Sequence, residues 1–262
     1  MQIDNKLIND DELVTVYYSG KYREIICCRQ ETQQVKVTKL SQTQYVDNTT
    51  NEIKDYKYLH SKSIDNFKRD FKNVPRLIRG YFDGDSTEKF ITLTYSSKME
   101  DPYRLSYDFK KFMQKLERRY CKCRYFYVKE PQENGSWHIH SLIKRLDEKL
   151  FNITVETVCD LWLHGHEVAV KTPSNIATLP FYFDITRFEN KISRLIYYPP
   201  YLKIYGHSKD MKIKKSRDKY KNCKPDNMVK TYSAENEYVA VNQNDGEVYG
   251  CWKTAYEQYI KP

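Results

Sequence analysis

The sequence lacks the patterns that mark several common classes of protein. Its seven cysteines include no CxxC pair, so neither a zinc ribbon nor a disulfide framework is predicted. No apolar run approaches the roughly 20 residues that a membrane-spanning helix needs. The first residues, MQIDNKLINDDELV, show no basic segment followed by an apolar stretch, so no signal peptide is expected. A P-loop of the form GxxxxGK[ST] is also absent. We therefore expect a soluble intracellular protein with reduced thiols.

Net charge and aromatic content favour a polyanionic partner. The 262 residues include 44 Lys and Arg and 35 Asp and Glu, so the formal charge is 44 − 35 = +9. Basic side chains that neutralise phosphates release counterions, which favours nucleic acid, although ribosomal and membrane-surface proteins share this balance. The 24 tyrosines suit either stacking on unpaired bases or packing in half-buried strands.

The middle of the chain alternates strand and helix patterns. Residues 89–95 read as a buried strand, and residues 106–120 read as a helix that begins at Ser106 and buries one apolar face. Strands at 124–130 and 137–144 are joined by a short polar loop and predict a β-hairpin, and a helix at 155–163 and a strand at 167–171 follow. This order predicts an α+β fold in which helices cover one face of an antiparallel sheet.

Composition changes along the chain predict three parts. Residues 1–80 hold short β pieces and a helical stretch that breaks near Pro75. Residues 81–216 carry the α+β pattern, and residues 217–262 form a basic segment followed by a hairpin with its turn at Asn244-Asp245-Gly246. The length allows one decorated domain or two small ones.

A pair of histidines is the first candidate for chemistry. His138 and His140 are two residues apart on a predicted strand, so their side chains point to the same face with Cβ atoms about 6.6–6.8 Å apart. Glu130 ends the partner strand of the hairpin and would lie opposite them. A His/His/Glu set leaves coordination positions open and accepts Mg²⁺, Mn²⁺ or Zn²⁺.

The residues around this pair resemble a known family. The stretch EPQENGSWHIHSLI resembles the second motif of HUH endonucleases, and FITLTY upstream resembles their first motif. The steps Trp162-Leu-His-Gly165 and YYPPYLKIYGHSKDMKIKK are similar to segments of phage and plasmid replication initiators. The resemblance covers roughly residues 89–216.

The resemblance implies a defined reaction. A divalent ion, Mg²⁺ or Mn²⁺, would be held by Glu130, His138 and His140, and a tyrosine would attack the scissile phosphate to leave a 5′-phosphotyrosine and a free 3′-OH. This implies a replication initiator that nicks single-stranded DNA at an origin and works with a host helicase and polymerase in the cytoplasm of a prokaryotic host. Relaxases and transposases use the same chemistry and stay open as alternatives.

The nucleophile departs from the pattern that the resemblance implies. The family places its tyrosine in a phrase like Y-x-x-K, and DITRFENKI aligns Phe188 with that tyrosine and Lys191 with the lysine. Phe188 could be an engineered change, the alignment could be shifted, or a divergent member could use Tyr182, Tyr197 or Tyr198 instead. A non-catalytic single-stranded DNA-binding protein on the same scaffold is the further alternative.

Two more features of the sequence bear on function. The basic segment 203–224 interleaves Tyr205 and Tyr220 with its cations and suggests a DNA-tracking surface. The DNA-binding candidates there are Lys203, Lys209, Lys212, Lys214, Lys215 and Arg217. A second HxH, His164 and His166, follows a predicted helix end and is expected to lie in a loop.

Overall fold

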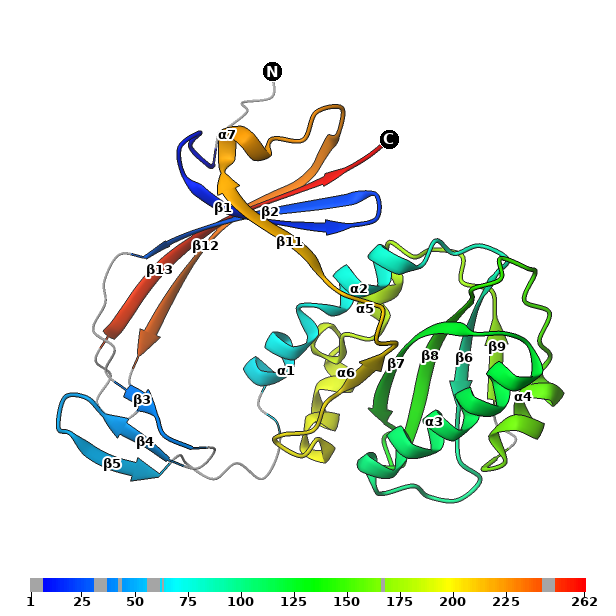
Figure 1. Ribbon diagram of the computed structural model, residues 1–262. Helices are drawn as coiled ribbons and strands as arrows, with labels where there is room; N and C mark the ends of the chain where they lie inside the picture. The colour runs from blue at the N-terminus through cyan, green and yellow to red at the C-terminus, as the bar shows by residue number, and fades with distance from the viewer. Residues whose placement is uncertain are drawn as a thin grey trace. The chain divides into compact units, whose positions relative to one another are not determined.

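The computed structural model divides the chain into two compact units (Figure 1). The terminal unit comprises Met1–Tyr58 and Lys214–Pro262, and the central unit comprises Leu59–Ile213. The structure describes residues 7–30, 37–41, 44–55, 62, 64–165, 168–241 and 248–262. Within these residues no helix is both long enough and apolar enough to cross a membrane.

The central unit is built on a five-stranded antiparallel sheet, which confirms the α+β prediction. Its order is β10-β7-β8-β6-β9. The strands are β6 (Glu88–Leu93), β7 (Cys123–Pro131), β8 (Trp137–Arg145), β9 (Val168–Lys171) and β10 (Tyr205–His207). The β7–β8 hairpin forms as expected and places Glu130 directly opposite His138.

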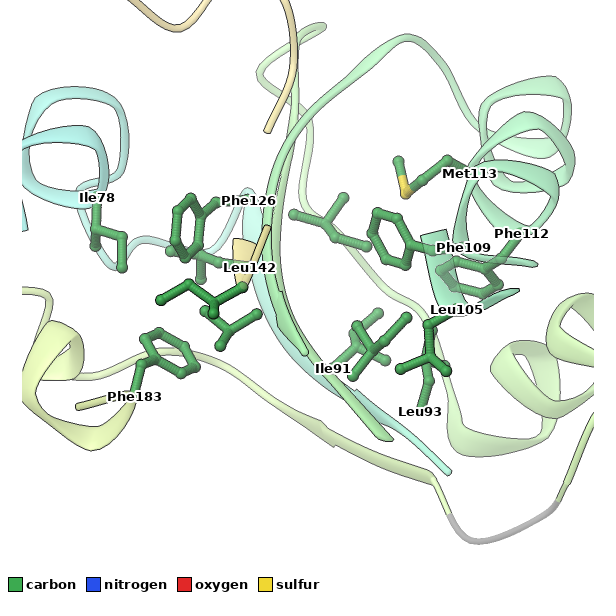
Figure 2. Close-up of a cluster of buried hydrophobic side chains, with 14 of the residues drawn as sticks. Ile78, Ile91, Leu93, Leu105, Phe109, Phe112, Met113, Phe126, Leu142 and Phe183 are labelled. Carbon is green, nitrogen blue, oxygen red and sulfur yellow. The ribbon is translucent and has the colours of Figure 1, made fainter. Parts of the chain in front are cut away.

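Helices cover both faces of this sheet, which corrects the expectation of one covered face. Figure 2 shows Leu105, Phe109 and Phe112 against one side, while Ile78 and Phe183 lie with Phe126 and Leu142 on the other. All of them belong to one buried apolar cluster. The one-face expectation was wrong because every second residue of β8, including Leu142, is also buried and needs an apolar cover.

The helices of the first group begin where local capping chemistry allows. α3 spans Pro102–Arg119 and starts a full turn before Ser106, because the Asp101 side chain accepts a hydrogen bond from the Tyr103 N–H and Pro102 occupies the first turn. Ser106 instead lies inside the helix, where its Oγ contacts Tyr127. α4 (Val155–Trp162) is capped by Thr154.

The helices on the opposite face come from two parts of the chain. α1 (Ile64–Phe71) and α2 (Val74–Tyr81) are separate helices, and Pro75 stands in the first turn of α2, close to the predicted break. A run of short helical pieces follows β9. These are α5 (Leu179–Tyr182), η1 (Ile185–Arg187), α6 (Glu189–Ile192) and η2 (Ser193–Tyr197).

The terminal unit joins the two ends of the chain in one sheet of order β11-β1-β2-β13-β12. Its strands are β1 (Leu13–Ser19), β2 (Tyr22–Gln30), β11 (Lys214–Lys219), β12 (Val229–Val241) and β13 (Val248–Ile260). The predicted C-terminal hairpin is present as β12 and β13, and its turn at residues 244–246 lies outside the described residues. A three-stranded sheet, β3 (Val37–Lys39), β4 (Gln44–Asp47) and β5 (Glu52–Asp55), belongs to the same unit.

A small buried core holds the terminal sheet together. Tyr220, in the short helix α7 (Tyr220–Cys223), is only 4% exposed and donates a hydrogen bond to Glu257 Oε2 at 2.6 Å. Tyr259 donates to the same oxygen at 2.7 Å, and Lys230 donates to Oε1 at 2.9 Å. Tyr220 is therefore not available to stack on DNA bases, which corrects its suggested role in a DNA-tracking surface.

Candidate metal centre and tyrosine site

The structure brings Glu130, His138 and His140 together at one end of the β7–β8 hairpin. One ligand atom from each residue lies within 4.8 Å of the others. The Nε2 atoms of the two histidines are 2.9 Å apart, and His140 Nε2 is 3.5 Å from Glu130 Oε2. The convergence follows from strand alternation and from the hairpin register that opposes Glu130 to His138.

The three side chains are buried, and two of their polar atoms lack partners. Glu130 is 2%, His138 7% and His140 5% exposed. In the described part of the chain, Glu130 Oε2 and His138 Nδ1 accept or donate no hydrogen bond. Leaving buried polar atoms unsatisfied costs roughly 1–3 kcal/mol each. A cation bound by the carboxylate would satisfy Glu130 Oε2, so this donor set fits a divalent metal.

The protonation states also suit cation binding. Burial alone would raise the pKa of Glu130, but contact with His140 and the positive charge of Lys191 hold it at about 2. Burial, reinforced by the neighbouring His140, lowers the pKa of His138 to about 3. An ionised carboxylate and a neutral imidazole are the forms that bind metal ions. Thr92 Oγ1 lies 3.0 Å from His140 Nδ1 and orients that ring.

Two cations from the helical segment after β9 contact the other oxygen of Glu130. Lys191 Nζ lies 3.0 Å and Arg194 Nη1 lies 3.1 Å from Glu130 Oε1. The sequence pattern pointed to Lys191 but not to Arg194, although a spacing of three residues would place both on one helical face. Together they bring positive charge to the site, which favours an approaching phosphate.

Tyr182 is the tyrosine that the structure places beside the histidines. Its ring centroid lies 5.3 Å from that of His140 in an edge-to-face arrangement. Lys191 Nζ lies 4.7 Å from the Tyr182 ring centroid, and the residue is 45% exposed. Burial of part of the ring, reinforced by the charge of Glu130, raises the pKa of its hydroxyl. Tyr182 thus combines proximity to the metal candidates with access from solvent.

The other nucleophile candidates are placed differently. Tyr198 is fully buried, and its hydroxyl donates to the Lys129 carbonyl at 3.2 Å. The Tyr197 hydroxyl donates to the Glu133 carbonyl at 3.2 Å. Phe188 stands at the start of α6 and contacts Lys191, whose Nζ is 5.4 Å from its ring centroid. Among the ring contacts of the described residues, Phe188 has none with either histidine.

Residues 88–183 match a family model of replication-associated proteins, the ORF2 type. The matched stretch contains Glu130, His138, His140 and Tyr182, and it ends before Phe188. It supports the role of a replication initiator, and therefore interaction with DNA. No curated protein and no solved structure matches the chain significantly.

The structure divides the DNA-binding candidates between the two units. Lys203, Lys209 and Lys212 flank β10 in the central unit, and Lys214, Lys215 and Arg217 lie on β11 in the terminal unit. All six are exposed. The central-unit lysines share a unit with the metal candidates, so their contribution to DNA binding is a prediction that can be tested together with that site.

The second HxH lies in a different place from the first. His164 follows α4, and its Nε2 lies 3.7 Å from Asp108 Oδ1. His164 also packs its ring against Trp162 at 4.9 Å between centroids. His166 lies outside the described residues. His164 therefore contributes to packing around α3 and α4.

Mn²⁺ is expected to stabilise the protein through Glu130, His138 and His140. An ion that binds only the folded state at 100 times its Kd adds about 2.7 kcal/mol to the free energy of unfolding, which is roughly a 5–10 °C rise in Tm for a unit of this size. The measurement is a thermal melt with Mn²⁺ against EDTA, and Glu130→Gln should remove the rise.

A second carboxylate group in the central unit provides the matched control. Asp83, Asp85 and Glu88 also place ligand atoms within 4.8 Å of one another. Lys144 Nζ already lies 2.6 Å from Asp83 Oδ2 and 3.0 Å from Glu88 Oε1. We expect Asp83→Asn to keep the Mn²⁺-dependent rise. Loss of the rise in Asp83→Asn, with retention in Glu130→Gln, would place the ion at the wrong cluster.

Proposed function

We propose that this protein nicks single-stranded DNA by metal-assisted transesterification, with Tyr182 as the nucleophile. The observation that supports this most strongly is the joint placement of the Glu130, His138 and His140 ligand atoms within 4.8 Å beside the Tyr182 ring. The family match to residues 88–183 supports a reaction on DNA. The proposal moves the nucleophile from the position of Phe188, which has no hydroxyl, to a tyrosine six residues earlier.

The residues of the site divide the work of such a reaction. A bound divalent ion supplies Lewis acidity that polarises the scissile phosphate. Lys191 and Arg194 add positive charge at the same place and favour the phosphate over bulk solvent. The Tyr182 oxygen forms the new bond to phosphorus while the bond from phosphorus to the 3′-oxygen breaks. The phenol proton passes to solvent, and the 3′-oxygen leaves as a hydroxyl after taking up a proton.

The product of this step suits the start of rolling-circle replication. A 5′-phosphotyrosine conserves the phosphodiester for later rejoining, and the free 3′-OH is a primer. Because the sequence lacks a P-loop, a host helicase would unwind the duplex and a host polymerase would extend the primer. The proposal therefore places the protein in the cytoplasm of a prokaryotic host. A relaxase or transposase would make the same bond on a different DNA, so the preferred substrate distinguishes these roles.

Covalent trapping on single-stranded oligonucleotides tests the chemistry. The wild-type protein with Mn²⁺ and a broad pool of 3′-labelled oligonucleotides should give a protein–DNA adduct that survives denaturing electrophoresis. EDTA should prevent the adduct, and His138→Ala and His140→Ala should lose it. Binding of the pool without any nick or adduct would contradict the proposal and favour the non-catalytic DNA-binding alternative.

A further inference from the structure

An exposed apolar stripe runs along the helical segment that follows the candidate site. Phe188, Ile192 and Ile196 are 40%, 39% and 69% exposed. They are spaced four residues apart over α6 and η2, so they lie on one face of the segment. Leu195 packs against the core of the central unit, and these three residues are not part of that cluster. A neighbouring row of large apolar side chains in water usually marks a contact surface.

The same segment turns its charged side chains toward the metal candidates. Lys191 and Arg194 reach Glu130 Oε1 at 3.0 and 3.1 Å. Lys191 also contacts the Phe188 ring, with its Nζ 5.4 Å from the ring centroid. The stripe therefore begins beside the cations of the site and continues away from them. A ligand that occupies the site meets phosphate-binding charge first and apolar surface next.

We propose that this stripe binds unpaired nucleobases of the strand that enters the site. The inference rests on the proposed function for its location. A nucleotide joins an anionic phosphate to a flat apolar base, so a strand whose phosphate lies at Lys191 and Arg194 brings its neighbouring bases to Phe188 and Ile192. Aromatic and apolar side chains receive such bases without sequence preference. In duplex DNA the base faces are stacked on one another, so the stripe favours unpaired DNA.

The size of the stripe argues against a protein partner. A stable protein–protein interface buries about 800 Å² on each side, and three side chains on a short segment fall far below that area. Continuity with the charged side of the segment favours a ligand that carries both phosphate and apolar groups. The proposal also gives Phe188 a function that needs a ring and no hydroxyl.

Binding measured without metal tests the stripe separately from the chemistry. The experiment is fluorescence anisotropy in EDTA with a fluorescein-labelled oligothymidine of about 20 nucleotides and an abasic oligonucleotide of the same length. Phe188→Ala and Ile192→Ser should weaken oligothymidine binding roughly 5- to 100-fold and leave binding of the abasic strand unchanged. Phe188→Tyr should bind like the wild type, because it keeps the ring.

Leu146→Ser is the matched control. Leu146 is 44% exposed and follows the opposite end of β8 from the histidines, so its variant should bind both strands normally. Absence of oligothymidine binding by the wild type, equal losses on both strands, or no loss on either would overturn the proposal. So would a change in oligomeric state of Ile196→Ser in the ultracentrifuge, which would assign the stripe to self-association. Base-dependent binding in a protein that forms no adduct would contradict the nicking reaction and leave the stripe standing.

Discussion

Tyr182→Phe is expected to abolish the covalent protein–DNA adduct, lowering its yield on the order of 10³-fold or more, as removal of a catalytic nucleophile does in other enzymes. The substitution removes one hydroxyl from a side chain that is 45% exposed, so the fold and DNA binding should persist. The measurement is the trapping assay with Mn²⁺, accompanied by a thermal melt and by anisotropy on the same oligonucleotides.

Other tyrosines supply the controls for this prediction. Tyr197→Phe removes a hydroxyl that already donates to the Glu133 carbonyl, so it should keep the adduct. In the double variant Tyr182→Phe/Phe188→Tyr, the new hydroxyl stands at the position that sequence alignment gives to the family tyrosine. Restoration of the adduct in that variant would return the nucleophile position to residue 188, and an adduct in Tyr182→Phe alone would exclude Tyr182.

Gly165→Ala is expected to produce the largest loss of stability. A Cβ at Gly165 would lie 2.6 Å from the Thr94 carbonyl oxygen and 2.7 Å from the Ser96 nitrogen. These are backbone atoms, and the Ser96 N–H donates to the His164 carbonyl at 2.8 Å, so neither side moves without breaking that contact. Overpacking of this kind costs about 1–3 kcal/mol, sometimes more, which corresponds to a fall in Tm of roughly 2–12 °C. Thermal melts followed by circular dichroism measure it.

Gly80→Ala is the comparison for the general effect of exchanging glycine for alanine. Gly80 lies in α2, and alanine is the better helix former by about 1 kcal/mol. Its Tm should stay the same or rise. A Gly165→Ala protein that melts with the wild type would mean that the loop after α4 gives way easily and does not fix the end of β6.

The metal candidates could be predicted because their geometry is local. Two histidines with a spacing of two on a strand share a face, and a short polar loop fixes the register of a hairpin. The observed opposition of Glu130 and His138 depends on one short stretch of continuous sequence. No long-range packing had to be known to bring these three side chains together.

The partners of that set depend on packing that the sequence pattern does not encode. Tyr182, Lys191 and Arg194 arrive on short helical pieces well after His140 in the chain. Their order along the chain does not say which of them faces the sheet. Alignment by phrase favoured Phe188, whereas the fold places Tyr182 against His140. Choosing among tyrosines needed the path of the chain between β9 and β10.

Errors in the fold prediction have similar physical causes. Ser106 is a reasonable helix cap by residue type, but Asp101 followed by Pro102 caps the helix earlier. Tyr220 sits among lysines and was expected to be accessible, yet it meets Glu257, 37 residues later, in a buried hydrogen bond. Both outcomes depend on competition between local signals or on distant partners.

The pairing of β2 with β13 has a consequence for synthesis on the ribosome. Ile25 lies opposite Glu257, a separation of 257 − 25 = 232 residues, whereas the residues of the central unit are contiguous. Domains generally fold as units while the chain emerges. The unit with the candidate nicking site can therefore complete its sheet while β2 still presents an open edge to the cytosol. That edge is an aggregation hazard until the final residues are translated, so slow or interrupted translation would endanger the terminal sheet before the central one.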